Sequence, residues 1–438
     1  MNTSHDRTRH DRTRHGRTSC SPGGVARLAG AGLALLLGAV ACTSAPGPAP
    51  TATTLAPHQR QPRVVCSAGA QSTSGITPHD TDAPDDPTPT GATSTVIVAV
   101  DADGRPHLVT TEADQAPTTA AAVDASPGLE VVAIEPDIAI SATESAPTAA
   151  ASCDDPFRPQ QWALDSLGVE SIWETSVGAD IDIAIVDTGV DGGHPDLVGH
   201  VAPGVSFVGT GGTAQTGAGD TDPNGHGTHV AGIAAAGAQD GVGIAGVAPF
   251  TRILPVRVLD STGAGSSSAV AAGITWAVDN GAEVINLSLG GSYSGAIATA
   301  VDYADSRGVV VVAATGNTGT ANSVMYPAAL ATVIAVASHD SSGSLSPFSS
   351  RGPQVDVAAP GSSIVSAYPG AQWRLMQGTS MATPHVAGTV ALMFGVDLFR
   401  SPEQVRALIR SSAVDAGTPG FDDGFGWGRL DAAAALGL

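Results

Sequence analysis

Apolar runs rich in β-branched residues recur along the C-terminal part of this chain, and they limit its fold more than any other feature. The runs read IDIAIVDTGV, RILPVRVLD, EVINLSLGG, GVVVVAATGN, TVIAVAS and VDVAAPG, and helical patterns separate them. Strands that are apolar along their whole length are buried on both faces, as in a parallel sheet with helices on each side. Residues 153–438 are therefore predicted to form an α/β domain, a three-layer sandwich with a mainly parallel central sheet.

Polar and glycine residues follow several of these predicted strands. Asp187, the segment 288–291 and the pair Gly316 and Asn317 each stand where a strand is expected to end. In open α/β sheets, ligands bind beyond the carboxyl ends of the strands. We therefore expect the functional site at this edge of the sheet.

The N-terminal region has the composition of an export signal. An Arg/His-rich start over residues 5–17 precedes an apolar stretch over residues 28–40, and the tripeptide Ala-Val-Ala comes directly before Cys42. The apolar stretch is too short for a membrane span. Residues 1–41 are predicted to direct secretion. Two outcomes stay open, cleavage by an ordinary signal peptidase or attachment of a lipid to Cys42.

The chain is acidic, with a formal net charge of -22, and its cationic side chains are all arginine. Nucleic acids and anionic lipid surfaces carry charge of the same sign and would be repelled, so neither is expected as a partner. No second long apolar run lies near the C-terminus. We therefore expect no transmembrane span.

Composition divides the rest of the chain into two linkers and two structured parts. Residues 42–93 are rich in Pro, Thr, Ala and Ser, a composition that buries too little apolar surface to order itself. The runs TVIVAV and LEVVAIEPDIAI then read as strands of a small module over residues 94–141. A second linker, residues 142–152, precedes the main domain at 153–438.

Two of the four cysteines are candidates for a disulfide. Cys20 and Cys42 belong to the signal region, which leaves Cys66 and Cys153 as a pair in an oxidising compartment. Whether the two sulfur atoms come close enough to bond is left open by the sequence.

Three segments carry the residue types that a serine needs to hydrolyse an amide: a carboxylate, a base and a hydroxyl. Asp187 closes IAIVDTGV, His226 lies among glycines in DPNGHGTHVAGIAAA, and Ser380 lies in MQGTSMATPHVAGTVALM. Simpler interpretations exist for each. An Asp at a strand end is often structural, and a Ser before an apolar helix is often only its N-cap.

The same edge of the sheet offers donors for an oxyanion. Asn317 follows a buried strand, and its side-chain amide can project toward that edge. A serine at a helix N-terminus has a backbone N–H without a helical acceptor, beside the positive end of the helix dipole. Pro384 is expected in the first turn of that helix, where its missing N–H leaves no bond unmade.

Two metal-binding interpretations of the His226 segment are weaker. His226 and His229 lie on one helical face, but a hydrolytic zinc helix has the pattern H-E-x-x-H and no Glu is present. Asp220 begins a stretch that imitates a calcium loop. Its twelfth position is Ala231, where such loops need a bidentate Glu.

The three segments, in the order Asp, His, Ser, resemble the subtilase family of serine endopeptidases, its thermitase-like and subtilisin-like branches in particular. The resemblance covers most of residues 155–436, including GIAGVAP, VINLSLGG, VAAPGSSI and GWGRLDAAAAL. It implies that Asp187 orients the base, His226 is the general base and then acid, and Ser380 is the nucleophile. Asn317 and the Ser380 amide would form the oxyanion hole.

The resemblance also implies how substrate binds. Ser288, Leu289 and Gly290 would pair with the backbone of an extended substrate and form one wall of the first specificity pocket. Unfolded or loop segments of proteins are the expected substrates. Met325 stands where some relatives have Gly, at the floor of that pocket, and would favour small or medium apolar side chains.

The resemblance implies structural calcium, with no cofactor for catalysis. Carboxylates of Asp155, Asp196 and Asp240, with the carbonyls of Val242 and Ile244, would hold the ion, since hard oxygen ligands suit Ca²⁺. The module over residues 94–141 resembles the propeptide of these proteases, which implies a zymogen whose partner is its own propeptide. A monomer is expected, and processing is expected within residues 141–152.

Two rival functions differ in class from a protease. A catalytically silent binding protein on the same scaffold would be expected if a residue of the triad or of the oxyanion hole were substituted. None of these residues is substituted. An esterase of the α/β-hydrolase kind would need a G-x-S-x-G elbow, whereas the residues from Gly378 to Ala382 read GTSMA.

Overall fold

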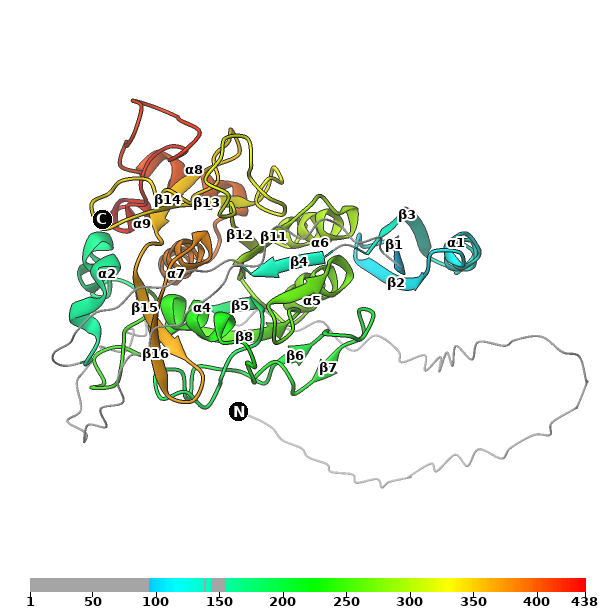
Figure 1. Ribbon diagram of the computed structural model, residues 1–438, viewed down its shortest axis with the longest axis horizontal. Helices are drawn as coiled ribbons and strands as arrows, with labels where there is room; N and C mark the ends of the chain where they lie inside the picture. The colour runs from blue at the N-terminus through cyan, green and yellow to red at the C-terminus, as the bar shows by residue number, and fades with distance from the viewer. Residues whose placement is uncertain (1–93, 138, 143–154) are drawn as a thin grey trace, which may run out of the picture. The chain divides into compact units, whose positions relative to one another are not determined.

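The computed structural model describes residues 94–137, 139–142 and 155–438, which all belong to one compact unit, His58–Leu438 (Figure 1). The strands are β1 (Ser94–Asp101), β2 (Pro106–Glu112), β3 (Leu129–Pro136), β4 (Ala139–Ala142), β5 (Asp182–Asp187), β6 (Val205–Ser206), β7 (Gln215–Thr216), β8 (Arg252–Arg257), β9 (Ala264–Ser266), β10 (Val284–Leu287), β11 (Leu289–Gly291), β12 (Val310–Ala314), β13 (Ile334–His339), β14 (Val357–Pro360), β15 (Ile364–Tyr368) and β16 (Gln372–Met376). The helices are α1 (Ala116–Asp124), α2 (Trp162–Leu167), α3 (Val169–Ile172), α4 (His226–Ala235), α5 (Ser267–Asp279), α6 (Gly295–Ser306), α7 (Thr379–Val396), α8 (Pro402–Ser412) and α9 (Ala432–Leu436), with a short 3₁₀ turn at Arg158–Gln160.

The central sheet has the strand order β14-β13-β12-β10-β5-β8-β6-β7. Every pairing in it is parallel except the pairing of β6 with β7. Each of the six apolar runs supplies one of its strands, and those strands are buried along almost their whole length. The predicted α/β sandwich with a mainly parallel sheet is confirmed.

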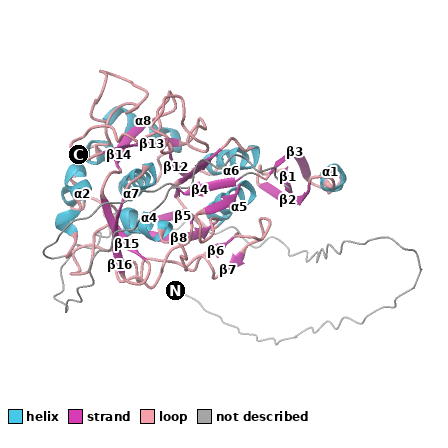
Figure 2. Ribbon diagram, in the orientation of Figure 1, coloured by secondary structure: helices cyan, strands magenta, loops and turns pink. Residues whose placement is uncertain are grey.

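Helices cover both faces of this sheet, as Figure 2 shows in cyan against the magenta strands. Ile183 and Ile185 of β5 pack in one core with residues of α4 and α7. Ala184 and Val186, which point to the opposite face, pack in a second core with α5 and α6. Among the helices that the structure describes, none is both long and apolar enough to cross a membrane.

The N-terminal module is a three-stranded antiparallel sheet, in the order β2-β1-β3, with α1 packed against it. The first run expected to be a strand is β1, the second is divided between β3 and the start of β4, and the residues between the two runs form β2 and α1. Val96 and Val98 of β1 join the core that contains α5 and α6. The module therefore buries apolar side chains against the helical layer of the main domain.

Two carboxylates of the module lie at helix N-termini of the main domain. Glu135 accepts hydrogen bonds from the N–H groups of Gly295 and Ala296 at the start of α6, each at 2.7 Å. Asp137 accepts hydrogen bonds from the Ser268 N–H and hydroxyl at the start of α5, at 3.0 and 2.7 Å. Unpaired N–H groups and the helix dipole favour negative charge at such positions.

The last strand of the module, β4, pairs with two strands of the main domain. It lies antiparallel between β11 and β9. Leu289, Gly290 and Gly291 lie opposite Ala142, Ser141 and Ile140, respectively. Leu289 and Gly290 are two of the residues expected to pair with substrate, and in this structure they pair with β4.

Candidate active site

Asp187 and His226 form a hydrogen-bonded pair at the carboxyl end of β5. His226 Nδ1 lies 2.8 Å from Asp187 Oδ1, and both side chains are fully buried. The Thr188 N–H donates to the same carboxylate oxygen at 2.7 Å. A carboxylate accepts hydrogen bonds, so Nδ1 is the ring nitrogen that donates to Asp187.

Asp222 fixes the position of this pair, and sequence reasoning missed its role. Its carboxylate accepts hydrogen bonds from the Thr188 hydroxyl at the end of β5 and from the Thr228 N–H in the first turn of α4, both at 2.8 Å. It also accepts from the Gly225 N–H at 2.8 Å. The signal in the sequence is an Asp four residues before the first residue of α4, whose N-cap is Gly225.

The loop before His226 has room only for glycine at position 225. Gly225 has φ +109°, and a Cβ there would lie 2.2 Å from the ring of Tyr368. The Tyr368 hydroxyl donates to the Asn224 carbonyl at 2.6 Å. The hairpin of β15 and β16 therefore holds the loop that presents His226.

His229 has partners of its own, away from Asp187. Its Nε2 lies 3.1 Å from the Ile364 carbonyl oxygen and 3.0 Å from the Arg374 carbonyl oxygen. Burial lowers the pKa of His229 to about 3, so the ring is neutral near pH 7. His229 joins α4 to the hairpin, which explains a second histidine in this segment without a metal.

Ser380 is the second residue of α7, the helix that packs against both β5 and α4. Its hydroxyl donates to the Ser288 carbonyl at 3.0 Å, and the Ser288 hydroxyl donates to the Ser380 carbonyl at 2.8 Å. This reciprocal pair connects the residue between β10 and β11 to the candidate nucleophile.

The expectation for Pro384 is wrong in one respect. The helix begins at Thr379, so Pro384 lies beyond the first turn. Its missing N–H would have bonded the carbonyl four residues earlier, which belongs to Ser380. The Ser288 hydroxyl takes that acceptor instead. Proline therefore releases the Ser380 carbonyl for the contact that connects α7 to the strand edge.

Asn317 is held by Thr379, the neighbour of Ser380. Its Oδ1 accepts from the Thr379 N–H at 3.0 Å and from the Thr379 hydroxyl at 2.9 Å. A backbone N–H can only donate, so the atom facing Thr379 is the oxygen and the Nδ2 donors point elsewhere. This orientation suits an oxyanion donor.

Comparison with known proteins gives the family. A family model described as the subtilase family matches residues 178–428, a range that includes Asp187, His226, Asn317 and Ser380. The chain belongs to the subtilase family. It is a subtilisin-like serine endopeptidase, and the resemblance read from the three segments is confirmed.

Several known proteins are similar to this subtilase over more than half of its length. Thermitase from Thermoactinomyces vulgaris is 48% identical over 262 residues, which are 59% of this chain and 91% of thermitase. Subtilisin DY from Bacillus licheniformis is 44% identical, with 59% and 91% covered. Fervidolysin from Fervidobacterium pennivorans, a keratinolytic enzyme related to subtilisin, has a similar structure with a TM-score of 0.69 and 29% identity. The match covers 83% of this subtilase and 63% of fervidolysin.

Met325 fills the space between two glycines of the subtilase. A Cβ at Gly290 would lie 3.0 Å from the Met325 Cβ, and a Cβ at Gly316 would lie 2.6 Å from its sulfur. Gly290 belongs to β11, and Gly316 precedes Asn317. The thioether therefore lies between the strand that pairs with β4 and the segment that carries the candidate oxyanion donor.

The expected calcium ligands lie near one another without forming a ready cluster. Asp155 accepts from the N–H groups of residues 239–241, and Asp196 accepts from the Trp373 indole N–H and the Ile244 N–H. Burial, together with the charges of Asp240 and Asp155, raises the pKa of Asp196 to about 8. Within the described ranges, no three His, Cys, Asp or Glu side chains converge as metal ligands.

One atom of this region fits a cation. Asp196 Oδ1 is buried and has no hydrogen-bond partner among the residues that the structure describes. A buried carboxylate oxygen without a donor is costly, and a cation removes that cost. A carboxylate oxygen is a hard ligand, so the donor chemistry at Asp196 suits Ca²⁺.

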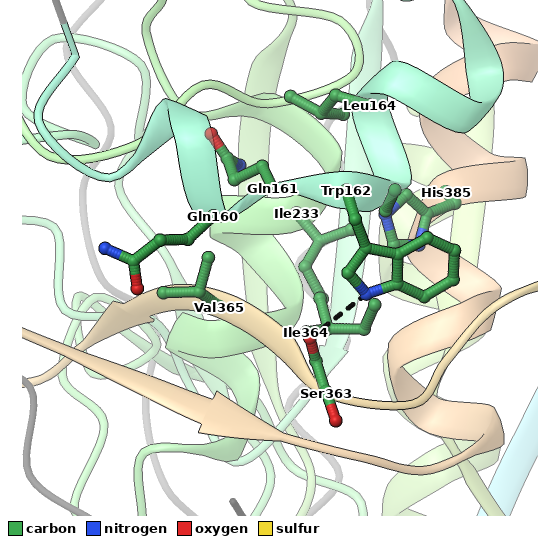
Figure 3. Close-up of a pocket in the computed structure, with 10 residues that line it drawn as sticks. Gln160, Gln161, Trp162, Leu164, Ile233, Ser363, Ile364, Val365 and His385 are labelled. Atoms are coloured by element: carbon green, nitrogen blue, oxygen red, sulfur yellow. Dashed lines mark hydrogen bonds between the residues drawn. The ribbon is translucent and has the colours of Figure 1, made fainter. Parts of the chain in front are cut away.

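A small cavity lies among the segment 160–164, α4, β15 and α7 (Figure 3). It has a volume of about 10 Å³ and is lined by residues 160–164, Ile233, residues 363–365 and His385. The Trp162 indole N–H donates to the Ser363 carbonyl in its wall at 3.2 Å. A cavity of this size holds about one water molecule, so it is not a substrate site.

Proposed function

We propose that this subtilase is an exported endopeptidase, made as a zymogen, whose triad is Asp187, His226 and Ser380. The observation that carries the proposal is the buried hydrogen bond of 2.8 Å between Asp187 and His226. Asp187 ends β5 and His226 begins α4, and α7 packs against both elements. This helix begins one residue before Ser380.

In the proposed reaction, Ser380 Oγ attacks the peptide carbonyl while His226 Nε2 takes its proton. Asp187 holds the ring in the reactive tautomer and stabilises the imidazolium that forms. Asn317 Nδ2 and the Ser380 N–H donate to the oxyanion. His226 then protonates the leaving amine, and water cleaves the acyl-enzyme by the same steps in reverse.

Substrate would bind as a strand in the place that β4 occupies. The antiparallel pairing of Leu289, Gly290 and Gly291 with β4 supports this mode. Main-chain hydrogen bonds of this kind need an extended peptide, which favours unfolded or loop segments as substrates.

Active-site labelling tests the proposed function. A fluorophosphonate should add once, on Ser380, and the unlabelled enzyme should cleave casein. The variant Ser380→Ala should do neither. Labelling of Ser380 without casein cleavage would support an esterase, and the absence of both activities would support a silent binding protein.

Met325 is proposed to limit the pocket for the residue before the cleaved bond. Met325→Gly should raise kcat/KM for a Phe substrate relative to an Ala substrate by roughly tenfold or more, because a larger side chain then fits. Kinetics with two peptides that differ only at this residue measure the ratio. Val324→Ala, at a neighbouring residue that packs against the core, should leave it unchanged. An unchanged ratio in Met325→Gly would place the pocket elsewhere.

Calcium is proposed to bind at Asp196, with Asp155, Asp240 and the carbonyls of Val242 and Ile244 as further ligands. Ca²⁺ at 100 times its Kd should stabilise the fold by about 2.7 kcal/mol, and a chelator should remove this gain. Calorimetry of the inactive Ser380→Ala chain, with Ca²⁺ or EGTA, measures the change in Tm.

Asp196→Asn distinguishes calcium binding at this site from a general effect of salt on stability. This variant should lose the response of Tm to calcium, whereas Asp423→Asn, at an exposed carboxylate, should keep it. An Asp196→Asn enzyme that still responds fully to calcium would rule out this site.

Export and processing are proposed from segments outside the described residues. Residues 1–41, the linker at 42–93, Cys42, Cys66 and Cys153 all lie there. The signal pattern supports secretion, with a lipid on Cys42 as one outcome, and a Cys66 to Cys153 disulfide would keep the module attached after cleavage. The intact mass of the mature secreted protein, reduced and unreduced, decides each point.

The module over residues 94–141 is proposed to be an inhibitory propeptide. Its support is the pairing of β4 with β11 and the contacts of Glu135 and Asp137 at the starts of α6 and α5. A module bound in this way blocks access of other peptides to Ser380.

A further inference from the structure

We propose that Arg374 selects acidic side chains on the leaving-group side of the bond that this subtilase cleaves. The leaving-group side is the part of a substrate that follows the cleaved bond, and the acyl side is the part that precedes it. This role rests on the proposed triad and adds a specificity that the triad does not explain. Its basis is the contact between the hairpin of β15 and β16 and the loop before His226.

Arg374 stacks on Tyr368, across the hairpin. The Arg374 Cζ lies 3.6 Å from the centroid of the Tyr368 ring. Arg374 pairs with Ser366 in the register, so Tyr368, two residues further along β15, is its diagonal neighbour on the same face. A guanidinium above an aromatic face is attracted by the ring quadrupole. The stack therefore holds the charge of this half-buried side chain at one place.

The Tyr368 ring also contacts the loop that presents His226. Its hydroxyl donates to the Asn224 carbonyl at 2.6 Å. A Cβ at Gly225 would lie 2.2 Å from the ring, so the backbone of Gly225 is in close contact with it. Gly225 directly precedes His226. One aromatic ring therefore contacts both the Arg374 guanidinium and the residue next to the proposed general base.

The direction of β4 indicates which side of a substrate comes nearest to the hairpin. A peptide that pairs as β4 does has its acyl side along β11 and β9. Ala142, the last residue of β4, lies opposite Leu289. The next residues of such a peptide therefore pass Ser288 and the Ser380 hydroxyl that donates to its carbonyl. In Figure 1, β4 runs toward α7 and α4, and β15 and β16 lie on that side of the molecule. The residues after the cleaved bond thus approach the hairpin.

Arg374 has hydrogen-bond donors that no protein group uses. Its Nη2 donates to Gln372 Oε1 at 3.3 Å, and its buried Nε has no acceptor among the residues that the structure describes. Within those residues no carboxylate forms an ion pair with Arg374, whereas Arg406 and Arg410 both pair with Asp356. A planar guanidinium with open donors matches the two oxygens of a carboxylate. An Asp or Glu side chain of a substrate is therefore the ligand whose chemistry fits.

The charge of the whole chain gives this contact its effect on specificity. The formal net charge is -22, so the field of the protein repels a carboxylate at most positions of a bound peptide. Arg374 supplies a local attraction against that field. Acidic side chains are therefore accepted beside the hairpin and disfavoured on the acyl side.

Kinetics with paired peptides test this role. The peptides carry Ala before the cleaved bond and differ only in Asp or its uncharged isostere Asn, at one of the first three positions after that bond. Arg374→Gln should lower the Asp-to-Asn ratio of kcat/KM by roughly threefold or more at one of these positions, because a charge-assisted hydrogen bond is lost. The same exchange at the second or third position before the bond should give a ratio that the variant leaves unchanged. Mass spectrometry of the products confirms the cleaved bond.

Arg307→Gln is the matched control. Arg307 also stacks on a tyrosine, with its Cζ 5.1 Å from the centroid of the Tyr303 ring, and its loss changes the net charge equally. It follows α6 and precedes β12, so it lies at the edge of the sheet opposite the carboxyl ends of the strands. This variant should keep the original ratio at every position. An equal fall in both variants would mean that only net charge matters and would overturn the role of Arg374.

The ratio also excludes an indirect effect through His226. It compares two substrates of one enzyme, so a general loss of activity caused by a displaced Tyr368 affects both and cancels. A folded Arg374→Gln enzyme with the original ratios at all positions would overturn the inference, even if its kcat were lower.

The unchanged enzyme covers the case in which Arg374→Gln does not fold. Its Asp-to-Asn ratio should be roughly threefold or more higher at the favoured position after the bond than at the positions before it. Equal ratios on the two sides overturn this inference, whereas cleavage of the Asn peptides leaves the proposed function standing. If no peptide is cleaved and a fluorophosphonate does not label Ser380, the proposed function is overturned as well.

Discussion

Asp187→Asn should lower kcat about 10⁴-fold and leave KM within a few-fold of its original value. Asparagine keeps the shape of the side chain but removes the negative charge that stabilises the His226 imidazolium. If its amide nitrogen turns toward Nδ1, it also holds the ring in the unreactive tautomer. The magnitude is the one that triads of this kind show, including the triad of subtilisin.

Steady-state kinetics on an extended peptide, corrected by active-site titration, measure this effect. Asp182→Asn is the matched control, since Asp182 begins the strand that Asp187 ends and pairs with the half-exposed Arg252. Asp182 lies at the opposite end of β5 from Asp187, so its substitution should leave kcat close to the original value. A kcat within tenfold of the original in Asp187→Asn would exclude the proposed role of the carboxylate.

The central sheet could be predicted from the sequence because each of its strands shows its burial in its own run of residues. A strand buried on both faces must be apolar along its length, and runs such as GVVVVAATGN have that property in every residue that β12 uses. Asp187 and Asn317 could be named as candidate site residues because Asp187 ends one such strand and Asn317 follows another. The order of Asp, His and Ser then gave the family through resemblance.

Contacts between distant segments could not be predicted in the same way. Nothing in the sequence around Ser288 signals that its hydroxyl replaces the N–H that Pro384 lacks, because the two residues meet only after β10 and α7 have packed. Asp222 was considered as part of an imitation calcium loop, yet its carboxylate is occupied by Thr188 and Thr228. The functions of these residues depend on the fold.

The module also combines strands that the sequence predicts with contacts that it does not predict. Its strands follow from apolar alternation, and its likeness to a propeptide follows from one run of residues. The acceptors at the N-termini of α5 and α6 are two carboxylates that the sequence places in the unremarkable stretch EPD. Their effect depends on where two helices begin, more than 100 residues later in the chain.

A large loss of turnover is also expected when the proposed oxyanion donor is removed. Asn317→Ala should lower kcat by roughly 10²–10³ with little change in KM, a range that subtilisin itself shows for this kind of donor. The charge on the oxygen exists only in the transition state, so the lost hydrogen bond affects turnover and not substrate binding. Kinetics with one peptide substrate measure both parameters.

A second substitution at the same position separates catalysis from support of the helix start. Asn317 Oδ1 accepts from the Thr379 N–H and hydroxyl at 3.0 and 2.9 Å, so removal of the side chain also leaves these donors without that acceptor. Asn317→Asp keeps the acceptor and loses the donor, and it should be at least as impaired as Asn317→Ala. Thr379→Ser, which keeps the hydroxyl, should remain close to the original activity. If Asn317→Asp were as active as the original enzyme, Asn317 would serve to hold Thr379, and the oxyanion would need another donor.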